Sequence, residues 1–449
     1  MKKFLSLATL ISTSVWANLH LAPPDFESAV GRAVFVDFQT AEYEITYDTS
    51  AEEARVKSKI TFIATKKGHP IFDLIPFPQN VRLNGEEVDE RLISLPGNVS
   101  KVRLLSQSVT PGLHTLEMEH VMGANVIFWN FNRGISSAFW IRDLSDRMFL
   151  EQYLPTNLEF DQYKMTMNIN FEGDNFKQDI YTNGKLTKFS ESNYRIEFPP
   201  YFTTSSVYFH TTPRGAMKRS DYVYTSISGK KIPVTVYSPY RFRTAAFKRK
   251  SFRMLEELEA DYGPWGHDSF VGYGTMPGVG GMEHSGAAQT SLAALDHEML
   301  HSYFAKGVMP ANGNSGWIDE AIASWRDNGY PRYPAVNFVG SNLGGHSIYK
   351  RNTDKRCYKL GNLFMAYLDY RLQDMGGLKA FLKGYFQTYN HTLITTEHFL
   401  NNLEFFSGLS LREDFEKYIW GQNVDSLTDD TEFDPHHAPV TASQLKSIL

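Results

Sequence analysis

The stretch ALDHEMLHSYFAKG, residues 294–307, decides how the rest of the chain is interpreted. Residues four apart in a helix lie on one face, so His297 and His301 can bind the same metal ion. Neutral imidazoles suit zinc, and Glu298 lies beside them, rotated away, where it can reach a water at the metal. The pattern predicts a helix over residues 291–305 and a hydrolytic zinc site. The alternative is a solvent-facing helix that happens to carry two histidines.

A catalytic zinc ion needs three protein ligands and one open position. After His301, 18 residues precede Glu320, which lies in GWIDEAIASW. The sequence suggests a helix over residues 317–328, and a carboxylate on this second helix would complete a His-His-Glu site. Asp327 follows Glu320 by seven residues, two helical turns along roughly the same face, where it can orient a ligand imidazole.

A glycine-rich stretch, GGMEHSGA, spans residues 280–287. Its glycines would let a substrate backbone approach an edge strand closely, with Gly281 and Met282 as substrate-binding residues. Glu283 would point into the same cleft, where its carboxylate could bind the free α-ammonium group of a peptide. The alternative is a glycine-rich surface loop with an exposed glutamate.

The composition is that of a soluble globular protein with two to three domains. The chain has 449 residues, 21% of them charged, and a net charge of −5. It therefore lacks the excess of positive charge that is typical of proteins that bind nucleic acid. Its one cysteine, Cys357, excludes an internal disulfide and is expected to be a small buried residue.

The first 17 residues, MKKFLSLATLISTSVWA, have the order of a cleavable signal peptide: two lysines, a short apolar stretch and a small final residue. Bacterial export to the periplasm or the medium is therefore expected. No later window is apolar enough for a membrane span.

Two regions with different patterns of apolar residues follow along the chain. Residues 18–215 alternate polar and apolar positions between turn residues, which predicts an all-β domain; Asn84-Gly85 and Asn183-Gly184 are typical of tight hairpins. Residues 216–425 mix strands with helical spacing, including expected helices over 245–262, 361–374 and 376–420. Residues 426–449 are expected to form a C-terminal tail.

The zinc stretches resemble the aminopeptidase N and leukotriene hydrolase family of zinc peptidases, in the gluzincin clan. That family has Gly-x-Met-Glu-Asn, His-Glu-x-x-His, a glutamate at the same spacing and a later tyrosine. The matching stretches here are GGMEH, HEMLH, WIDEAIASW and YKLGN. GGMEH is also similar to the glycyl aminopeptidase family of the same clan, because His284 replaces the Asn.

The resemblance implies an α+β multidomain protein, in which an N-terminal antiparallel β-saddle or sandwich domain precedes a thermolysin-like zinc metallopeptidase domain. One zinc ion would be held by His297, His301 and Glu320. Glu298 would act as general base and then general acid. By the same resemblance, Tyr358 would stabilise the oxyanion and Glu283 would hold the amino terminus of the substrate.

The expected function is zinc-dependent hydrolysis of peptide bonds, with peptides as substrates. The preferred interpretation is removal of N-terminal residues. The alternatives are a zinc endopeptidase of the same fold and, from another class, a catalytically silent zinc-containing binding protein. The family's second amine-binding group would come from the β domain, with Glu151 and Gln152 as candidates, although both fit ordinary structural positions better. The sequence leaves the oligomeric state open, a monomer included.

Overall fold

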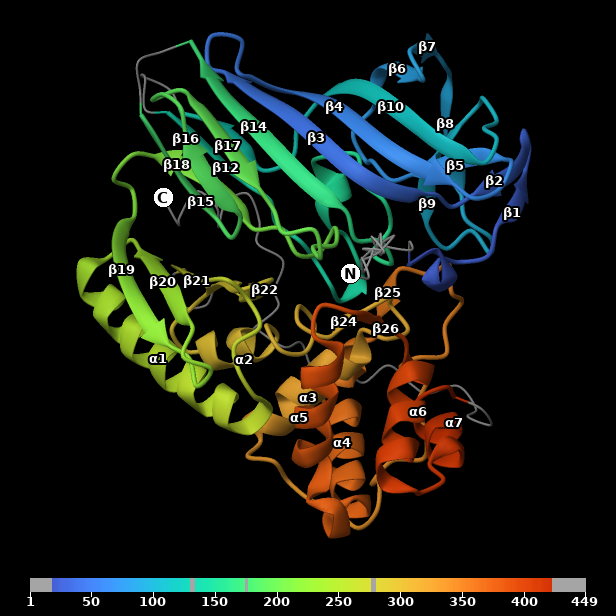
Figure 1. The fold of residues 1–449 in the computed structure, drawn as a ribbon, viewed down its shortest axis with the longest axis vertical. Coiled ribbons are helices and arrows are strands. Elements are labelled where there is room, and N and C mark those ends of the chain that lie inside the picture. Colours follow the sequence, from blue (N-terminus) through green and yellow to red (C-terminus); the bar gives the residue numbers. More distant parts are fainter. Residues whose placement is uncertain (1–17, 130–133, 174–176, 276–279, 422–449) are drawn as a thin grey trace, which may run out of the picture.

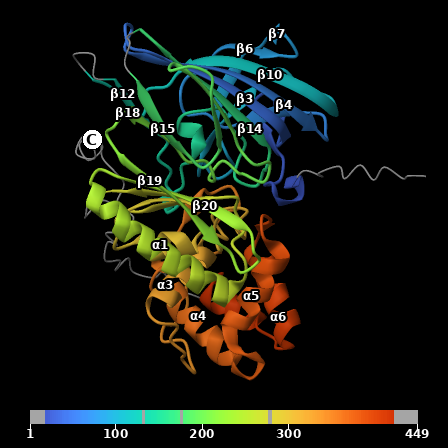
Figure 2. The same ribbon diagram turned by 60° about the vertical axis from the view of Figure 1, so that its left-hand side comes forward.

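The structure, a computed structural model, describes residues 18–129, 134–173, 177–275 and 280–421. Strands form one half of the molecule, and a smaller sheet with a group of helices forms the other (Figure 1). The turned view shows the same division, with α1 below the smaller sheet (Figure 2). The expected signal peptide and C-terminal tail lie outside the described residues.

The largest sheet of the described chain is eight-stranded and alternates as its sequence predicts. In β3 the buried side chains of Tyr43, Ile45 and Tyr47 share one face, while Glu42 and Glu44 point to solvent. In sheet order its strands are β16 (Lys185–Lys188), β17 (Asn193–Glu197), β14 (Lys164–Glu172), β3 (Asp37–Asp48), β4 (Glu53–Ala64), β10 (Gly112–Val121), β6 (Gln79–Leu83) and β7 (Glu86–Glu87).

Two further sheets complete the β-rich half. One contains β1 (Phe26–Ser28), β2 (Gly31–Val34), β5 (His69–Phe72), β9 (Lys101–Leu105) and β8 (Glu90–Ser94). The other contains β11 (Val126–Phe128), β12 (Ile135–Ala138), β18 (Phe209–Pro213) and β15 (Gln178–Thr182). The expected antiparallel pairing is the rule, but β3 with β14 and β2 with β5 run parallel.

The smaller sheet positions the candidate site. Its order is β19 (Lys218–Thr225), β20 (Lys231–Ser238), β21 (Phe270–Gly274), β23 (Ala287–Thr290) and β22 (Met282–His284). Strand β22 therefore forms an edge, as the glycine-rich stretch predicts. The turn between β22 and β23 contains Gly286 at φ +64°, a backbone conformation that glycine adopts without strain.

Helices fill the rest of this half and bury one apolar core around Trp317, Phe364 and Phe399. They are α1 (Arg241–Tyr262), α2 (Leu295–Leu300), α3 (Trp317–Asp327), α4 (Leu360–Arg371), α5 (Gly377–Tyr389), α6 (Thr396–Ser407) and α7 (Arg412–Tyr418). Short 3-10 turns are η1 (Asn18–Leu21), η2 (Leu150–Gln152), η3 (Lys355–Cys357) and η4 (Gln373–Met375). Cys357 is buried and unpaired with another cysteine, as expected.

Two helix predictions are wrong in extent. The helix expected over 291–305 is only α2, because the chain after His301 turns sharply and Ala305 has φ +117°. The helical stretch expected over 376–420 is three helices, because Asn390 leaves helical geometry and Gly408 closes α6 in the left-handed conformation.

The two Asn-Gly turns differ. Asn84 and Gly85 both have positive φ and join β6 to β7 in the hairpin that the sequence predicts. Asn183-Gly184 instead joins two sheets, since β15 pairs with β18 and β16 with β17. The physical reason is that the Asn183 amide donates to the carbonyl oxygens of Ser206 in the β-rich half and of Ser285 in the other half, which holds it between the two.

The two halves share backbone pairing and buried charges. Strand β13 (Ser145–Asp146) pairs with β25 (Asn352–Thr353), which lies just before Tyr358 in the chain. Arg351 reaches across to the carboxylates of Asp73 and Glu151. A second short pairing joins β24 (Met309–Pro310) to β26 (Leu393–Ile394) within the helical half.

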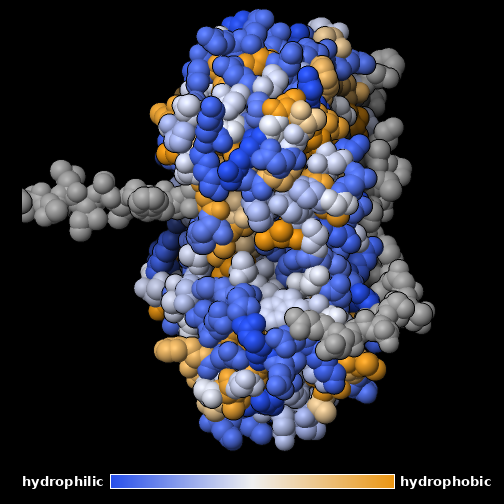
Figure 3. Space-filling view, turned by 90° about the vertical axis from the view of Figure 1, so that its right-hand side faces the viewer, coloured by the Kyte–Doolittle hydropathy of each residue, from blue (hydrophilic) through white to orange (hydrophobic). Residues whose placement is uncertain are grey.

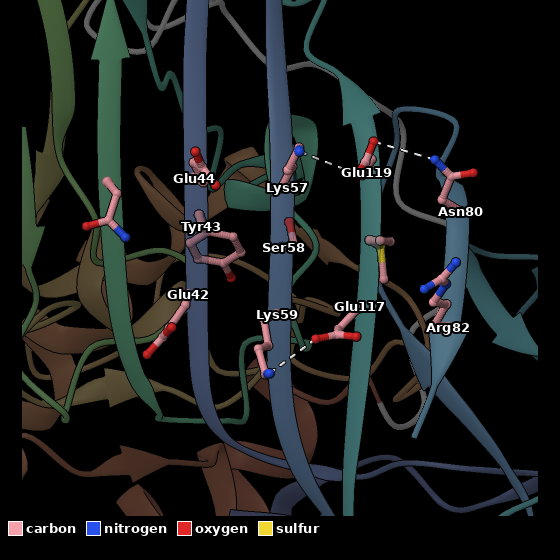
Figure 4. A pocket seen from close by; sticks show the side chains of 12 residues that line it. Glu42, Tyr43, Glu44, Lys57, Ser58, Lys59, Asn80, Arg82, Glu117 and Glu119 are labelled. Atoms are coloured by element: carbon pink, nitrogen blue, oxygen red, sulfur yellow. Dashed lines mark hydrogen bonds and ion pairs between the residues drawn. The ribbon is translucent and has the colours of Figure 1, made fainter. Parts of the chain in front are cut away.

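A polar hollow of about 530 Å³ lies on the solvent side of the eight-stranded sheet (Figure 4). Its charges already pair across strands, Lys59 with Glu117 at 3.2 Å and Lys57 with Glu119 at 3.8 Å. On another face, hydrophilic residues predominate and hydrophobic ones are scattered in small groups (Figure 3). None of the described helices is both long and apolar enough to cross a membrane.

Candidate metal centre

The structure brings together the three residues expected to bind zinc. His297 lies on α2, His301 directly follows that helix and Glu320 lies on α3, and one ligand atom from each falls within 4.8 Å of the others. The Glu320 carboxylate oxygen Oε2 lies 3.5 Å from Nε2 of His297 and 3.6 Å from Nε2 of His301. All three side chains are buried.

The Nδ1 atoms of both imidazoles have acceptors, and these determine which ring nitrogen is available to a metal. Nδ1 of His297 lies 2.6 Å from Asp327, and Nδ1 of His301 lies 3.3 Å from the carbonyl oxygen of Phe304. An acceptor at Nδ1 holds the proton there and leaves the Nε2 lone pair for a metal. Two imidazoles and one carboxylate with this orientation are a zinc donor set, and Asp327 lies where the sequence predicts an orienting partner.

Negative charge gathers around the cluster. Burial lowers the pKa of His297, but the hydrogen bond to Asp327 and the contact with Glu320 outweigh burial and leave that pKa well above its usual range. The same excess of carboxylates favours a divalent cation at the Nε2 atoms. Asp327 also borders a cavity of about 510 Å³ beside His297, so this side of the cluster faces solvent.

Glu298 lies next to the cluster and is completely buried. Burial is the main cause that raises its pKa to about 8, with a further contribution from the charge of Glu320. The chain approaches this carboxylate closely at Gly281: a Cβ atom there would lie 2.9 Å from Glu298 Cγ and closer still to the carboxylate itself. Gly281 therefore leaves the space in which Glu298 sits.

The remaining predicted residues surround this centre. Tyr358 is half-buried, with its ring centroid 6.3 Å from that of His297. Met282 and Glu283 lie on the edge strand β22, and both are buried rather than exposed on a loop. The candidates Glu151 and Gln152 have structural partners: Glu151 pairs with Arg351 at 2.8 Å, and the Gln152 amide donates to the carbonyl oxygen of Trp140.

Sequence reasoning misses two residues here. The ammonium of Lys306 lies 3.4 Å from Oε1 of Glu283, and both side chains are buried. Asp143, from the β-rich half, is also buried and raises the pKa of Glu283. The one available signal is Lys306 itself, a charged residue within the otherwise apolar and small run YFAKGVM.

The fold that carries these residues is also found in known proteins. No family model and no curated protein matches the sequence. Among solved structures, an M1 zinc metallopeptidase from Deinococcus radiodurans is 15% identical with a TM-score of 0.60, covering 89% of this chain and 97% of its own.

Two further structures agree. A variant of that metallopeptidase bound to a Tyr-Ser-Ala substrate has 15% identity and a TM-score of 0.62, with coverage of 87% of this chain and 96% of its own. Leukotriene A4 hydrolase from Saccharomyces cerevisiae has 11% identity and a TM-score of 0.61, with coverage of 89% and 69%. The expected fold class is thereby confirmed: an N-terminal β domain followed by a helical and β-sheet domain, in the architecture of the M1 zinc metallopeptidases and leukotriene A4 hydrolase.

Proposed function

We propose that the protein is a zinc-dependent peptidase of this family that removes N-terminal residues from peptides. The observation that carries the proposal is the buried His297, His301 and Glu320 cluster, with the carboxylate of Glu298 beside it. The N-terminal sequence adds a proposal that the protein is exported.

The donor set fits zinc, with His297 and His301 binding through Nε2 and Glu320 through a carboxylate oxygen. Zinc in such a site lowers the pKa of water and polarises a carbonyl group. Glu298 would accept the proton of the attacking water and pass it to the leaving amine. Asp327 would keep the His297 ring in its binding orientation, and the Tyr358 hydroxyl would donate a hydrogen bond to the oxyanion.

The edge strand β22 supports a peptide as the substrate. An extended peptide can add to the free edge of a sheet through main-chain hydrogen bonds. Such a peptide would lie beside Glu283 and the Glu298 carboxylate, because both are reached from this strand and from Gly281 just before it. Glu283 at this edge supports cleavage near the amino terminus.

An endopeptidase of the same fold is the second candidate, and one observation favours it. The expected amine anchor, Glu283, already faces the ammonium of Lys306. A carboxylate that already has an internal partner binds a free α-ammonium group more weakly.

The test of hydrolysis is the Glu298→Gln variant. It should keep zinc and lose activity on a short peptide by about 10²- to 10⁴-fold, because the carboxamide cannot accept the proton of water. The control is Glu256→Gln, the same change on the exposed side of α1. Zinc-loaded wild-type protein that cleaves no peptide, or a Glu298→Gln variant with full activity, would remove the proposal.

A further inference from the structure

Glu283 lies in a buried polar cluster, the Glu283 pocket, which it forms with Lys306 and Asp143. Its side chain is completely buried, and neither carboxylate oxygen accepts a hydrogen bond from a donor with good geometry in the described part of the chain. A buried carboxylate without compensation costs several kcal/mol, so the charges around it decide what the pocket can bind.

Lys306 supplies one compensating charge. Its backbone N–H donates to the carbonyl oxygen of His301, which fixes the turn after α2. From there the ammonium extends to Oε1 of Glu283 at 3.4 Å and to the Ser205 hydroxyl, also at 3.4 Å. The lysine side chain is only 3% exposed, so this ammonium belongs to the pocket and not to the surface.

Asp143 adds a second acidic group beside Glu283. It is also buried, and burial together with the negative charge of Asp143 raises the pKa of Glu283 well above its usual range. The ammonium of Lys306, 3.4 Å from Oε1, acts the other way and favours the charged carboxylate.

We propose that Lys306 is a specificity-determining residue, whose ammonium takes the place that a substrate α-ammonium would otherwise fill beside Glu283. A substrate ammonium at this position would bring a second positive charge next to Lys306, in surroundings with little water. The pocket therefore accepts a neutral group at this position at least as well, such as an acylated amino terminus or an internal peptide unit. The inference rests on the proposed peptidase function and, of its two candidates, favours the endopeptidase, because a free amino terminus gains no advantage at this position.

The experiment compares one internally quenched peptide with a free amino terminus and the same peptide acetylated. It is run with zinc-loaded wild-type protein at pH 6.5, where most α-amines are protonated. The wild type should cleave the two peptides with kcat/KM values within about threefold of each other. Lys306→Met should raise the ratio of free to acetylated cleavage at least about tenfold, because the positive charge that competes for Glu283 is removed.

Three variants control the result. Lys306→Arg keeps the positive charge and should keep the wild-type ratio. Lys306→Gln replaces Met if the apolar variant does not fold, since its amide can still donate a hydrogen bond to Glu283. Lys383→Met removes an exposed lysine on α5 and should change nothing.

A binding measurement separates this inference from the proposed function. Calorimetry with L-alanine amide and N-acetyl-L-alanine amide needs no turnover, so it reports on the pocket even if no peptide is cleaved. Equal affinities in the wild type and in Lys306→Arg, with an at least tenfold preference for the free amine in Lys306→Met or Lys306→Gln, support the proposal. A wild-type preference of tenfold or more for the free amine, or a ratio that the loss of Lys306 leaves unchanged, overturns it.

Discussion

Substitution of Gly281 by alanine should slow catalysis by about 10²-fold without unfolding the protein. A Cβ atom at this position would lie 2.9 Å from Glu298 Cγ, whereas ordinary contact begins at about 3.4 Å. Cγ would have to withdraw by at least about 0.5 Å, and the carboxylate, which lies closer, by about 1 Å. Because the atoms in the way are the far end of one side chain, Glu298 can move while the fold stays.

The size of the effect follows from that displacement. A misplacement of about 1 Å in a catalytic group can reduce the rate by about 10²-fold, equivalent to roughly 2.7 kcal/mol of transition-state stabilisation. The assay is kcat/KM on a short peptide, together with zinc content and the thermal unfolding midpoint. We expect a loss of about 10²-fold with zinc retained, because no metal-binding atom is displaced.

A matched control lies in the same sheet. A Cβ on Gly272 would meet its nearest neighbour, the ring of Phe270, at 3.4 Å, which is ordinary contact. Gly272→Ala should therefore keep activity within about threefold of the wild type. If Gly281→Ala were as active as Gly272→Ala, Glu298 could not be the proton acceptor at the position described here.

Three further predictions concern the rest of the site and its support. Asp327→Asn should weaken zinc binding about 10- to 100-fold, measured by competition with a chelator, because the amide holds the His297 ring less firmly; unchanged affinity would contradict its orienting role. Tyr358→Phe should lower kcat by about 10²- to 10³-fold and change KM less; an unchanged kcat would remove Tyr358 from the mechanism. Burial lowers the pKa of His210 from 6.5 to about 3. As the pH falls below 6.5, His210 binds a proton in the unfolded chain but stays neutral in the folded protein. The contribution of neutral His210 to the free energy of unfolding is therefore complete above pH 6.5 and is lost towards pH 3. Between pH 7 and 5 the loss should be about 2 kcal/mol, and His210→Leu should remove it in urea unfolding at the two pH values; equal pH dependence in both proteins would show that His210 does not control it.

The sequence could predict that His297, His301 and Glu320 lie together because much of the geometry of this cluster is local. The spacing of His297 and His301 belongs to one helical turn, and Glu320 lies on a helix that the apolar pattern marks. The edge position of Glu283 follows from a short strand next to glycines. These features depend on period and turn chemistry, which a single sequence contains.

What the sequence could not predict depends on contacts between distant segments. Lys306 and Glu283 are neighbours only because the turn after α2 faces β22, and Asp143 joins them from the other half of the molecule. The early end of α2 reflects the positive φ of Ala305, a residue with no preference for that conformation. Asn183 departs from a hairpin because its amide donates to carbonyl oxygens in both halves.

The pairing of β13 with β25 has a consequence for how the protein is made. During synthesis the β-rich half emerges first and folds as a unit. A nascent chain that ends at residue 345 already contains all three residues of the metal cluster. Tyr358 follows Asn352–Thr353 in the chain and lies beside His297 in the finished fold, in which that strand pairs with Ser145–Asp146. The folded β half thus provides the strand that positions Tyr358. In the proposed mechanism, the growing chain contains the residues of the metal site before it contains the residue that completes hydrolytic activity.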